Sequence, residues 1–280
     1  MEQSMALLQI RDLGMRFGGL TALENFRLSL PQGTLHGLIG PNGAGKTTVF
    51  NLISGFLRPT SGQIFFQGAD ITNLPPQRLT HRGIGRTFQN IRLFGDLSVL
   101  DNVLVACHWR TRASFWEAVG RLPRFIREER QYLKRSLELL EEVGLPDQDQ
   151  EKAGQLPYGH QRRLEIARAL ATGPLLLLLD EPAAGLNPQE TIELMQFLQN
   201  LRDRYQLTIL LIEHNMKFVM GICEQLTVLD HGLIIAEGTP TEVQDNPRVR
   251  QAYLGTELQD LSASHITKGP GFSGGGGRPE

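Results

Sequence analysis

A glycine-rich octapeptide between two regular elements constrains this chain more than any other feature. Residues 40–47 read Gly-Pro-Asn-Gly-Ala-Gly-Lys-Thr, which fits the pattern G-x-x-x-x-G-K-[ST]. Leu35–Ile39 before it reads as a short buried strand, and residues 48–53 after it continue as a helix with apolar spacing. A loop in that context surrounds a phosphate chain with backbone N–H groups at a helix N-terminus. The sequence therefore predicts a site for a nucleoside triphosphate.

Two side chains of this loop have definite chemical roles in such a site. The ammonium of Lys46 would reach the β- and γ-phosphates, and Thr47 would offer its hydroxyl to Mg²⁺. The predicted phosphate-binding residues are Gly40, Pro41, Asn42, Gly43, Ala44, Gly45, Lys46, Thr47 and Thr48.

Two carboxylates follow a second buried strand. The aliphatic run Leu175–Leu179 ends in Asp180 and Glu181. The C-terminal ends of parallel strands form the ligand-binding edge of an open α/β sheet. We expect Asp180 to hold the Mg²⁺ coordination sphere through water, and Glu181 to orient or deprotonate the attacking water.

Two further side chains have less specific signals. His214 follows the strand Thr208–Ile212, and this position at a strand's C-terminal end predicts a contact with the γ-phosphate. Phe17 has two interpretations: it packs in the core, or its ring stacks on a flat base.

Charge and composition limit the partners and the compartment. The 280 residues carry a formal net charge of −2, so no overall basic field recruits nucleic acid. Cys107 and Cys223 lie outside any metal-ligand spacing and are expected to be buried thiols in a reducing compartment. The N-terminus lacks the pattern of a signal peptide, and the longest aliphatic run, Leu175–Leu179, is far short of a membrane span. Work at a membrane would therefore require partners.

Strand-like and helical segments alternate, which predicts an α/β fold with a largely parallel sheet. The candidate core strands are Leu35–Ile39, Leu175–Leu179, Thr208–Ile212 and Leu226–Leu229. Residues 98–143 read as an inserted helical segment, and residues 63–66 before Gly68 indicate an antiparallel edge sheet. The basic stretch Arg110–Arg135 is either a solvated helix face or a contact for anionic lipid or a membrane partner. Residues 262–280, with four consecutive glycines, read as a disordered tail.

The order of the motifs resembles the ATPase domain of ABC transporters over roughly residues 5–255. The order is the glycine-rich loop, Gln89, a helix opened by residues 156–161, Asp180-Glu181, residues 184–187 and His214. The resemblance implies a P-loop NTPase of the ABC-transporter type, with a RecA-like core, an antiparallel edge sheet and a helical subdomain inserted at about residues 90–160. The implied ATPase domain spans residues 1–255, and residues 256–280 form the tail.

The resemblance also implies that two such domains dimerise head to tail around two ATP molecules. Glu181, His214 and Gln89 would then be catalytic, and Thr47, Gln89 and Asp180 would serve the metal. The signature segment of one subunit would face the ATP of the other. Its residues are Leu156, Pro157, Tyr158, Gly159, His160 and Gln161.

Further segments narrow the resemblance to the importer ATPases for branched-chain amino acids, the LivG type. They are residues 86–89, 92–94, 162–168, 182–188, 212–217, 246–249 and 252–255. In that family the chain pairs with a second ATPase of the LivF type, two integral membrane permeases and, indirectly, a periplasmic binding protein. The chain would lie at the cytoplasmic face of the inner membrane and would power uptake of branched-chain or other neutral amino acids, with its surface near Arg92–Asp96 against the permeases.

The signature segment departs from the general family pattern L-S-G-G-Q. Pro157 stands in place of serine and has neither a hydroxyl nor an N–H to donate to a phosphate. Proline suits the first position of a helix, so the departure does not change the expected fold. In a homodimer the departure would weaken both ATP sites, and in a heterodimer only one.

Other functions stay open at this point. Within the transporter class, the cargo could be urea or an amide, or the chain could serve lipid export. Outside it, a soluble ABC-type ATPase acting on nucleic acid usually carries two ATPase units or long basic insertions. A small-molecule kinase would leave the segment at residues 156–161 and His214 without roles.

Overall fold

The computed structural model describes residues 6–108 and 122–253. The disordered tail predicted for residues 256–280 and much of the basic stretch Arg110–Arg135 lie outside these residues. The division into a domain of residues 1–255 and a tail therefore stays a prediction.

A six-stranded sheet forms the centre of the molecule. In sheet order its strands are β10 (Leu233–Gly238), β9 (Gln225–Asp230), β3 (Leu35–Ile39), β8 (Thr208–Ile212), β7 (Leu176–Asp180) and β6 (Ile84–Arg86). All neighbours are parallel except β9 and β10. Every residue of β3, β7 and β8 is buried, as expected of parallel strands that are covered on both faces. The predicted largely parallel core sheet is confirmed.

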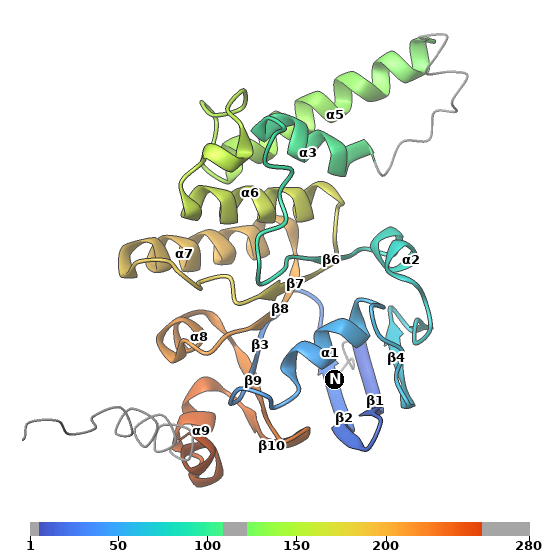
Figure 1. Ribbon diagram of the computed structural model, residues 1–280, viewed down its shortest axis with the longest axis vertical. Helices are drawn as coiled ribbons and strands as arrows, with labels where there is room; N and C mark the ends of the chain where they lie inside the picture. The colour runs from blue at the N-terminus through green and yellow to red at the C-terminus, as the bar shows by residue number, and fades with distance from the viewer. Residues whose placement is uncertain (1–5, 109–121, 254–280) are drawn as a thin grey trace, which may run out of the picture.

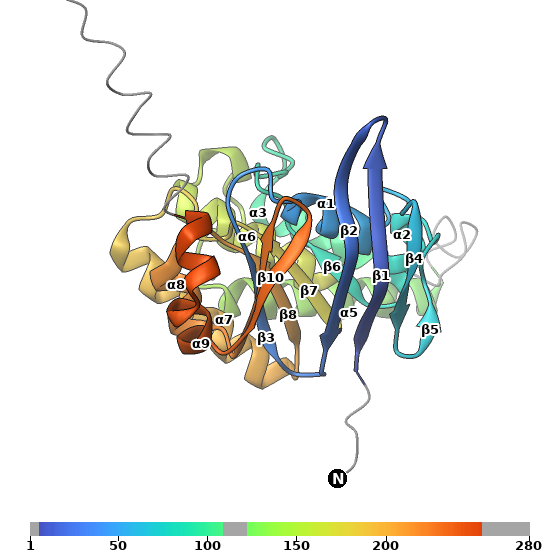
Figure 2. The same cartoon turned by 90° about the horizontal axis from the view of Figure 1, so that it is seen from below.

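A four-stranded antiparallel sheet stands beside it (Figure 2). In sheet order its strands are β2 (Leu20–Leu30), β1 (Leu8–Phe17), β4 (Ser61–Phe66) and β5 (Ala69–Asp70). Helix α1 (Lys46–Ile53) lies between the two sheets, and its Val49 and Phe50 share one core with Phe26 of β2 and Leu210 of β8. The edge sheet expected around residues 63–66 is therefore present.

Helices cover the other face of the six-stranded sheet. They are α6 (Tyr158–Ala171), α7 (Pro188–Tyr205), α8 (Met216–Ile222) and α9 (Pro240–Asp245). Helices α3 (Val99–His108) and α5 (Pro123–Glu142) pack on α6, at the end of the molecule farthest from β10 (Figure 1). A short helix α2 (Pro76–His81) precedes β6, and a 3-10 turn, η1 (Ala153–Gln155), precedes α6.

Both cysteines are buried, as predicted. The Cys107 thiol lies 3.5 Å from the Ser136 hydroxyl. Burial raises the pKa of the Cys223 thiol. Within residues 6–108 and 122–253, no helix combines the length and the apolar character that crossing a membrane requires.

Acid is expected to destabilise the fold through His36, a buried imidazole on β3. Its Nε2 lies 2.9 Å from the Thr227 hydroxyl, and burial lowers its pKa from 6.5 to about 4. Between these two pH values the unfolded chain takes up a proton that the folded chain does not. The free energy of unfolding should therefore fall by about 3 kcal/mol as the pH drops from above 6.5 to 4. Urea unfolding across this range measures the effect.

Two variants isolate the contribution of His36 from that of the carboxylates. His36→Gln keeps a polar partner for Thr227 but does not titrate, so its stability should fall less steeply with acid. His231→Gln is the matched control, because the His231 side chain is 91% exposed, and it should follow the wild type. An unchanged pH slope in His36→Gln would contradict the assignment.

Candidate functional site

The glycine-rich loop joins the C-terminal end of β3 to α1, where two glycines have no substitute. Gly40 adopts a φ of 149°, and a Cβ there would lie 2.0 Å from the Leu229 carbonyl oxygen. Gly45 caps α1 with a φ of 107°, and its Cβ would meet the Ala22 carbonyl oxygen at 2.8 Å. The loop is thus wedged between β9 and β2. This fixes the N-terminal amides of α1 in one orientation, as an anion site needs.

The side chain of Lys46 folds over this loop. Its Nζ donates to the carbonyl oxygens of Gly40 at 2.6 Å and Pro41 at 2.8 Å. Burial lowers the pKa of this ammonium, while the carboxylates of Glu181 and Asp180 act in the opposite direction. The cation therefore lies within electrostatic reach of both carboxylates that the sequence assigned to the same site.

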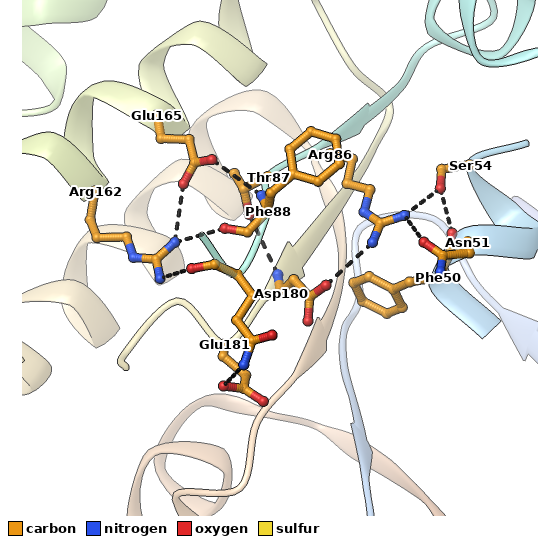
Figure 3. A network of polar contacts seen from close by, with 11 residues as sticks. Phe50, Asn51, Ser54, Arg86, Thr87, Phe88, Arg162, Glu165, Asp180 and Glu181 are labelled. Carbon is orange, nitrogen blue, oxygen red and sulfur yellow. Dashed lines mark hydrogen bonds and ion pairs between the residues drawn. The ribbon is translucent and has the colours of Figure 1, made fainter. Parts of the chain in front are cut away.

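Asp180 ends β7 as a buried carboxylate. Its Oδ2 accepts a hydrogen bond from Arg86 Nη2 at 3.3 Å, and its backbone N–H donates to the Thr87 hydroxyl at 3.4 Å (Figure 3). Burial raises the pKa of the Asp180 carboxyl, and the Arg86 guanidinium opposes that rise. No chemical role was predicted for Arg86. Its place in the segment 86–89 was the one signal in the sequence, because the ion pair joins residues 94 positions apart.

Glu181, one residue further, carries the candidate base. Its backbone adopts a left-handed φ of 48°, and its N–H donates to the Ile212 carbonyl at the end of β8. Gln89 Nε2 donates to Glu181 Oε2 at 2.9 Å, and His214 Nδ1 lies 3.8 Å from Glu181 Oε1. Three residues predicted as catalytic are thus brought together from three separate loops.

Glu213 is a further buried residue of this site, and no role was predicted for it. Its carboxylate accepts backbone N–H groups from Ala183 at 2.8 Å, His214 at 3.2 Å and Asn215 at 3.4 Å. Burial raises the pKa of this carboxyl, and the three amides oppose the rise. Because these amides come from the segment after β7 and from the segment after β8, Glu213 connects the two segments. This connection holds Glu181 near His214.

The signature segment opens α6, as the motif order led us to expect. Pro157 is the N-cap of this helix, with an extended ψ of 150°, and the first helical residue is Tyr158. Leu156 is buried in the core, and Gln161 Nε2 donates back to the Leu156 carbonyl at 2.8 Å. Tyr158 is half-exposed, beside Gly185.

A buried ion pair on α6 holds the segment of Gln89. Arg162 pairs with Glu165 at 3.1 Å and donates to the backbone carbonyls of Phe88 and Gln89 (Figure 3). Glu165 Oε1 in turn accepts the Phe88 N–H at 3.2 Å. Helix α6 is therefore bonded directly to the backbone that presents Gln89 to Glu181.

Phe17 ends β1 with 45% of its surface exposed. Of its two interpretations, packing in the core is wrong, and stacking on a base stays a prediction.

A groove of about 480 Å³ opens behind Gln89, between α2, β6 and α6. Phe56 and Phe94 form exposed parts of its wall, and Arg92 lies over the Phe88 ring at 4.2 Å. Arg168 lies over the Phe94 ring at 4.9 Å. The groove thus combines flat apolar surface with cations.

The donor set suits magnesium. No cluster of three or more His, Cys, Asp or Glu side chains able to hold a metal exists in the described part of the chain. Magnesium binds typically through one or two protein oxygens together with substrate phosphates. The Thr47 hydroxyl and the Asp180 carboxylate are such hard oxygen donors. Burial lowers the pKa of the neighbouring Lys46 ammonium, and the charge of Asp180 opposes that fall. These residues fit a metal that arrives with the nucleotide.

Two family models match the sequence. One, described as ABC transporter, matches residues 23–184, and the other, described as Branched-chain amino acid ATP-binding cassette transporter, matches residues 234–258.

Curated relatives match along nearly their whole length. The high-affinity branched-chain amino acid transport ATP-binding protein BraF of Pseudomonas aeruginosa is 46% identical over 252 residues, or 90% of this chain and 99% of BraF. The corresponding protein LivG of Escherichia coli K12 has the same identity and coverage. The lipopolysaccharide export system ATP-binding protein LptB of Acidithiobacillus ferridurans is 37% identical over 253 residues, covering 90% of this chain and 98% of LptB.

Solved structures share the fold. The ADP conformation of MJ1267, an ATP-binding cassette of an ABC transporter, superposes with a TM-score of 0.79 at 33% identity, covering 90% of this chain and 99% of that one. The dimeric structure of MJ0796, a bacterial ABC transporter cassette, gives a TM-score of 0.71 at 26% identity, covering 83% and 98%.

Proposed function

This chain belongs to the family of ATP-binding subunits of branched-chain amino acid ABC transporters, and we propose that its ATP hydrolysis powers uptake of branched-chain or other neutral amino acids through partner permeases. The predicted ABC-type P-loop fold and the ATPase class are confirmed. One observation carries the chemistry: the phosphate loop after β3 and the carboxylates after β7 lie at the same carboxyl edge of the sheet, where β3, β8 and β7 run parallel. The relatives support the transporter interpretation over the nucleic-acid ATPase and the kinase.

The chain's own groups divide the work of hydrolysis. The amides at the start of α1 and the ammonium of Lys46 bind the phosphates and neutralise charge that develops on the γ-phosphoryl group. Glu181 accepts the proton of the attacking water, and Gln89 holds the Glu181 carboxylate in position. His214, on the other side of that carboxylate, contacts the γ-phosphate.

Thr47 and Asp180 would hold Mg²⁺, with Gln89 close to its coordination sphere. When bound, Mg²⁺ would supply positive charge that offsets the charge developing on the phosphates. Asp180 suits this role because β7 and Thr87 fix its backbone at the edge of the sheet.

A second ATPase subunit completes the site from outside. In the proposed arrangement the segment of residues 156–161 faces the ATP of the partner, where the amides at the start of α6 are available. Because Pro157 supplies no hydroxyl, we propose a heterodimer in which a partner of the LivF type brings a stronger signature to this chain's own ATP. In this pairing, the ATP site formed by Lys46 and Glu181 of this chain is the more active of the two.

The groove behind Gln89 is the proposed docking site for one of the two permeases. It is lined by Arg92 and Phe94, which belong to the segment expected to contact the permeases, and by Phe88, whose carbonyl oxygen accepts a hydrogen bond from Arg162. A permease helix in the groove would therefore lie one residue from Gln89. We accordingly place the chain at the cytoplasmic face of the inner membrane, held there by permeases that a periplasmic binding protein supplies with cargo.

Co-purification tests the assembly. The full chain, tagged in its native host and extracted in mild detergent, should bring down two integral membrane proteins and a second ATPase. Phe94→Asp, which places a charge on the groove wall, should lose the membrane proteins and still bind ATP. Leu233→Asp is the matched control, because Leu233 is similarly exposed on β10, outside the groove. Recovery of only soluble partners or nucleic acid would contradict the transporter role.

Lipid export is the second candidate within the class, and the identity to LptB is its specific support. It has weaker support than amino acid uptake, because identity to BraF is 46% against 37% and the C-terminal match is to a branched-chain amino acid model. Membrane proteins of a lipid exporter in the co-purification would favour it instead.

A further inference from the structure

Arg86 is the best-anchored side chain near the nucleotide site to which no role has been assigned. Its Nη1 donates to Asn51 Oδ1 at 2.8 Å and to Ser54 Oγ at 2.7 Å, both at the end of α1 (Figure 3). Its Nη2 donates to Asp180 Oδ2 at 3.3 Å, and the side chains of this pair are only 8% and 6% exposed. One guanidinium thus joins the helix of the phosphate loop to the carboxylate expected to serve the metal.

Three aromatic rings surround the same guanidinium. Its central carbon lies 5.7 Å from the ring centroid of Phe50, 5.6 Å from that of Phe56 and 5.1 Å from that of Phe88. Phe56 and Phe88 pack edge to face at 5.9 Å, and both line the groove. Arg86 Nε is buried and has no hydrogen-bond partner within the described residues. The rings and three oxygen acceptors therefore define where the cation lies.

This arrangement makes Arg86 common to two surfaces. One edge of its guanidinium bonds Asp180, and its faces lie against the rings that a molecule in the groove would touch. Gln89 provides a separate connection between the groove and the nucleotide site, because it donates a hydrogen bond to Glu181 and not to Asp180. A displacement of Phe56 or Phe88 must move the guanidinium or remove its cation–π contacts, and either change alters the hydrogen bond to Asp180.

We propose that Arg86 is a positioning residue that links the groove to Asp180. A permease bound against Phe56 and Phe88 would then change the affinity of the nucleotide site for its metal. The proposal rests on the proposed function, since it takes Asp180 as the metal carboxylate and the groove as a docking site. The new element is the connection itself: docking changes the metal affinity through Arg86 and Asp180, independently of the base Glu181.

Metal affinity of the isolated full chain tests the link without permeases and without turnover. The probe is Mn²⁺, followed by electron paramagnetic resonance in the presence of a non-hydrolysable ATP analogue. Arg86→Gln should weaken Mn²⁺ binding about tenfold or more, because Asp180 loses a charge-assisted hydrogen bond. Binding of the analogue in EDTA should stay within about twofold, because the phosphate loop is intact.

A substitution on the groove wall separates the link from a general loss of structure. Phe56→Leu should weaken Mn²⁺ binding about two- to fivefold by removing one cation–π contact. Phe65→Leu is the matched control, since it removes a cation–π contact with Arg11, at 4.8 Å, on β4 and outside the groove. It should bind Mn²⁺ like the wild type.

A double-mutant cycle decides the route. In the Arg86→Gln background, Phe56→Leu should have no further effect on Mn²⁺ affinity. Equal effects of Phe56→Leu in both backgrounds, or tighter Mn²⁺ binding by Arg86→Gln, would overturn the proposal. If thermal unfolding shows that Arg86→Gln does not fold, Arg86→Lys replaces it in the cycle, because lysine keeps the charge but cannot span the three acceptors. A wild-type chain that failed to bind the analogue would instead contradict the proposed function.

Discussion

Glu181→Gln should retain ATP binding and lower the rate of hydrolysis by about 10²–10⁴-fold, the usual contribution of a general base. Glutamine has the same length, and it tolerates the left-handed backbone at this position as glutamate does. The amide can still bond Gln89, but it cannot accept the proton of the attacking water. ATP-binding and phosphate-release assays on the same preparation measure both quantities. Light scattering should also show that the ATP-bound dimer persists.

Two comparisons make this result specific. Glu129→Gln removes a carboxylate from the exposed side of α5, away from the site, and should hydrolyse ATP like the wild type. Glu181→Asp keeps a carboxylate but shortens its reach by one methylene, so most of the rate should still be lost. Near-normal turnover in Glu181→Gln would remove Glu181 from the role of base.

Lys46→Ala should lose ATP affinity itself, by about hundredfold or more, because it removes charge-assisted hydrogen bonds to the phosphates. The substitution also removes the hydrogen bonds that the Lys46 ammonium donates to the Gly40 and Pro41 carbonyl oxygens, so the loop loses contacts that stabilise its conformation. Calorimetric titration with ATP measures the change.

Lys217→Ala is the matched control for this change. Lys217 is an exposed lysine of α8, and its removal alters the net charge equally without touching the loop. Tight ATP binding by Lys46→Ala would contradict the assignment of the phosphate loop. An equal loss in both variants would indicate a general charge effect.

Features encoded by neighbouring residues could be predicted from the sequence. Leu176–Leu179 of β7 and Ile209–Ile212 of β8 are continuous apolar runs, and the loop before Lys46 has glycines where the backbone must approach β9 and β2. The carboxylates after β7 and the histidine after β8 follow from one rule, that parallel strands present their C-terminal ends at one edge. Local pattern and one topological rule therefore accounted for Lys46, Asp180, Glu181 and His214.

Contacts between distant segments could not be predicted this way. Arg86 looks like an ordinary surface cation until β6 pairs with β7 and buries it against Asp180. Glu213 reads as a solvated acid after a strand, yet it binds three backbone amides from two loops. The meaning of both depends on which strands are neighbours, and strand order is not encoded in periodicity.

Strand order also sets when the nucleotide site can form during synthesis. β3 ends at Ile39, but its two neighbours in the sheet begin at Thr208 and Gln225. At a synthesis rate of about 5–20 residues per second, β3 remains without its first neighbouring strand for roughly 8–35 seconds. A nascent chain stopped before β8 would present both edges of this strand to solvent, and this is the form that a chaperone would hold or a protease would remove.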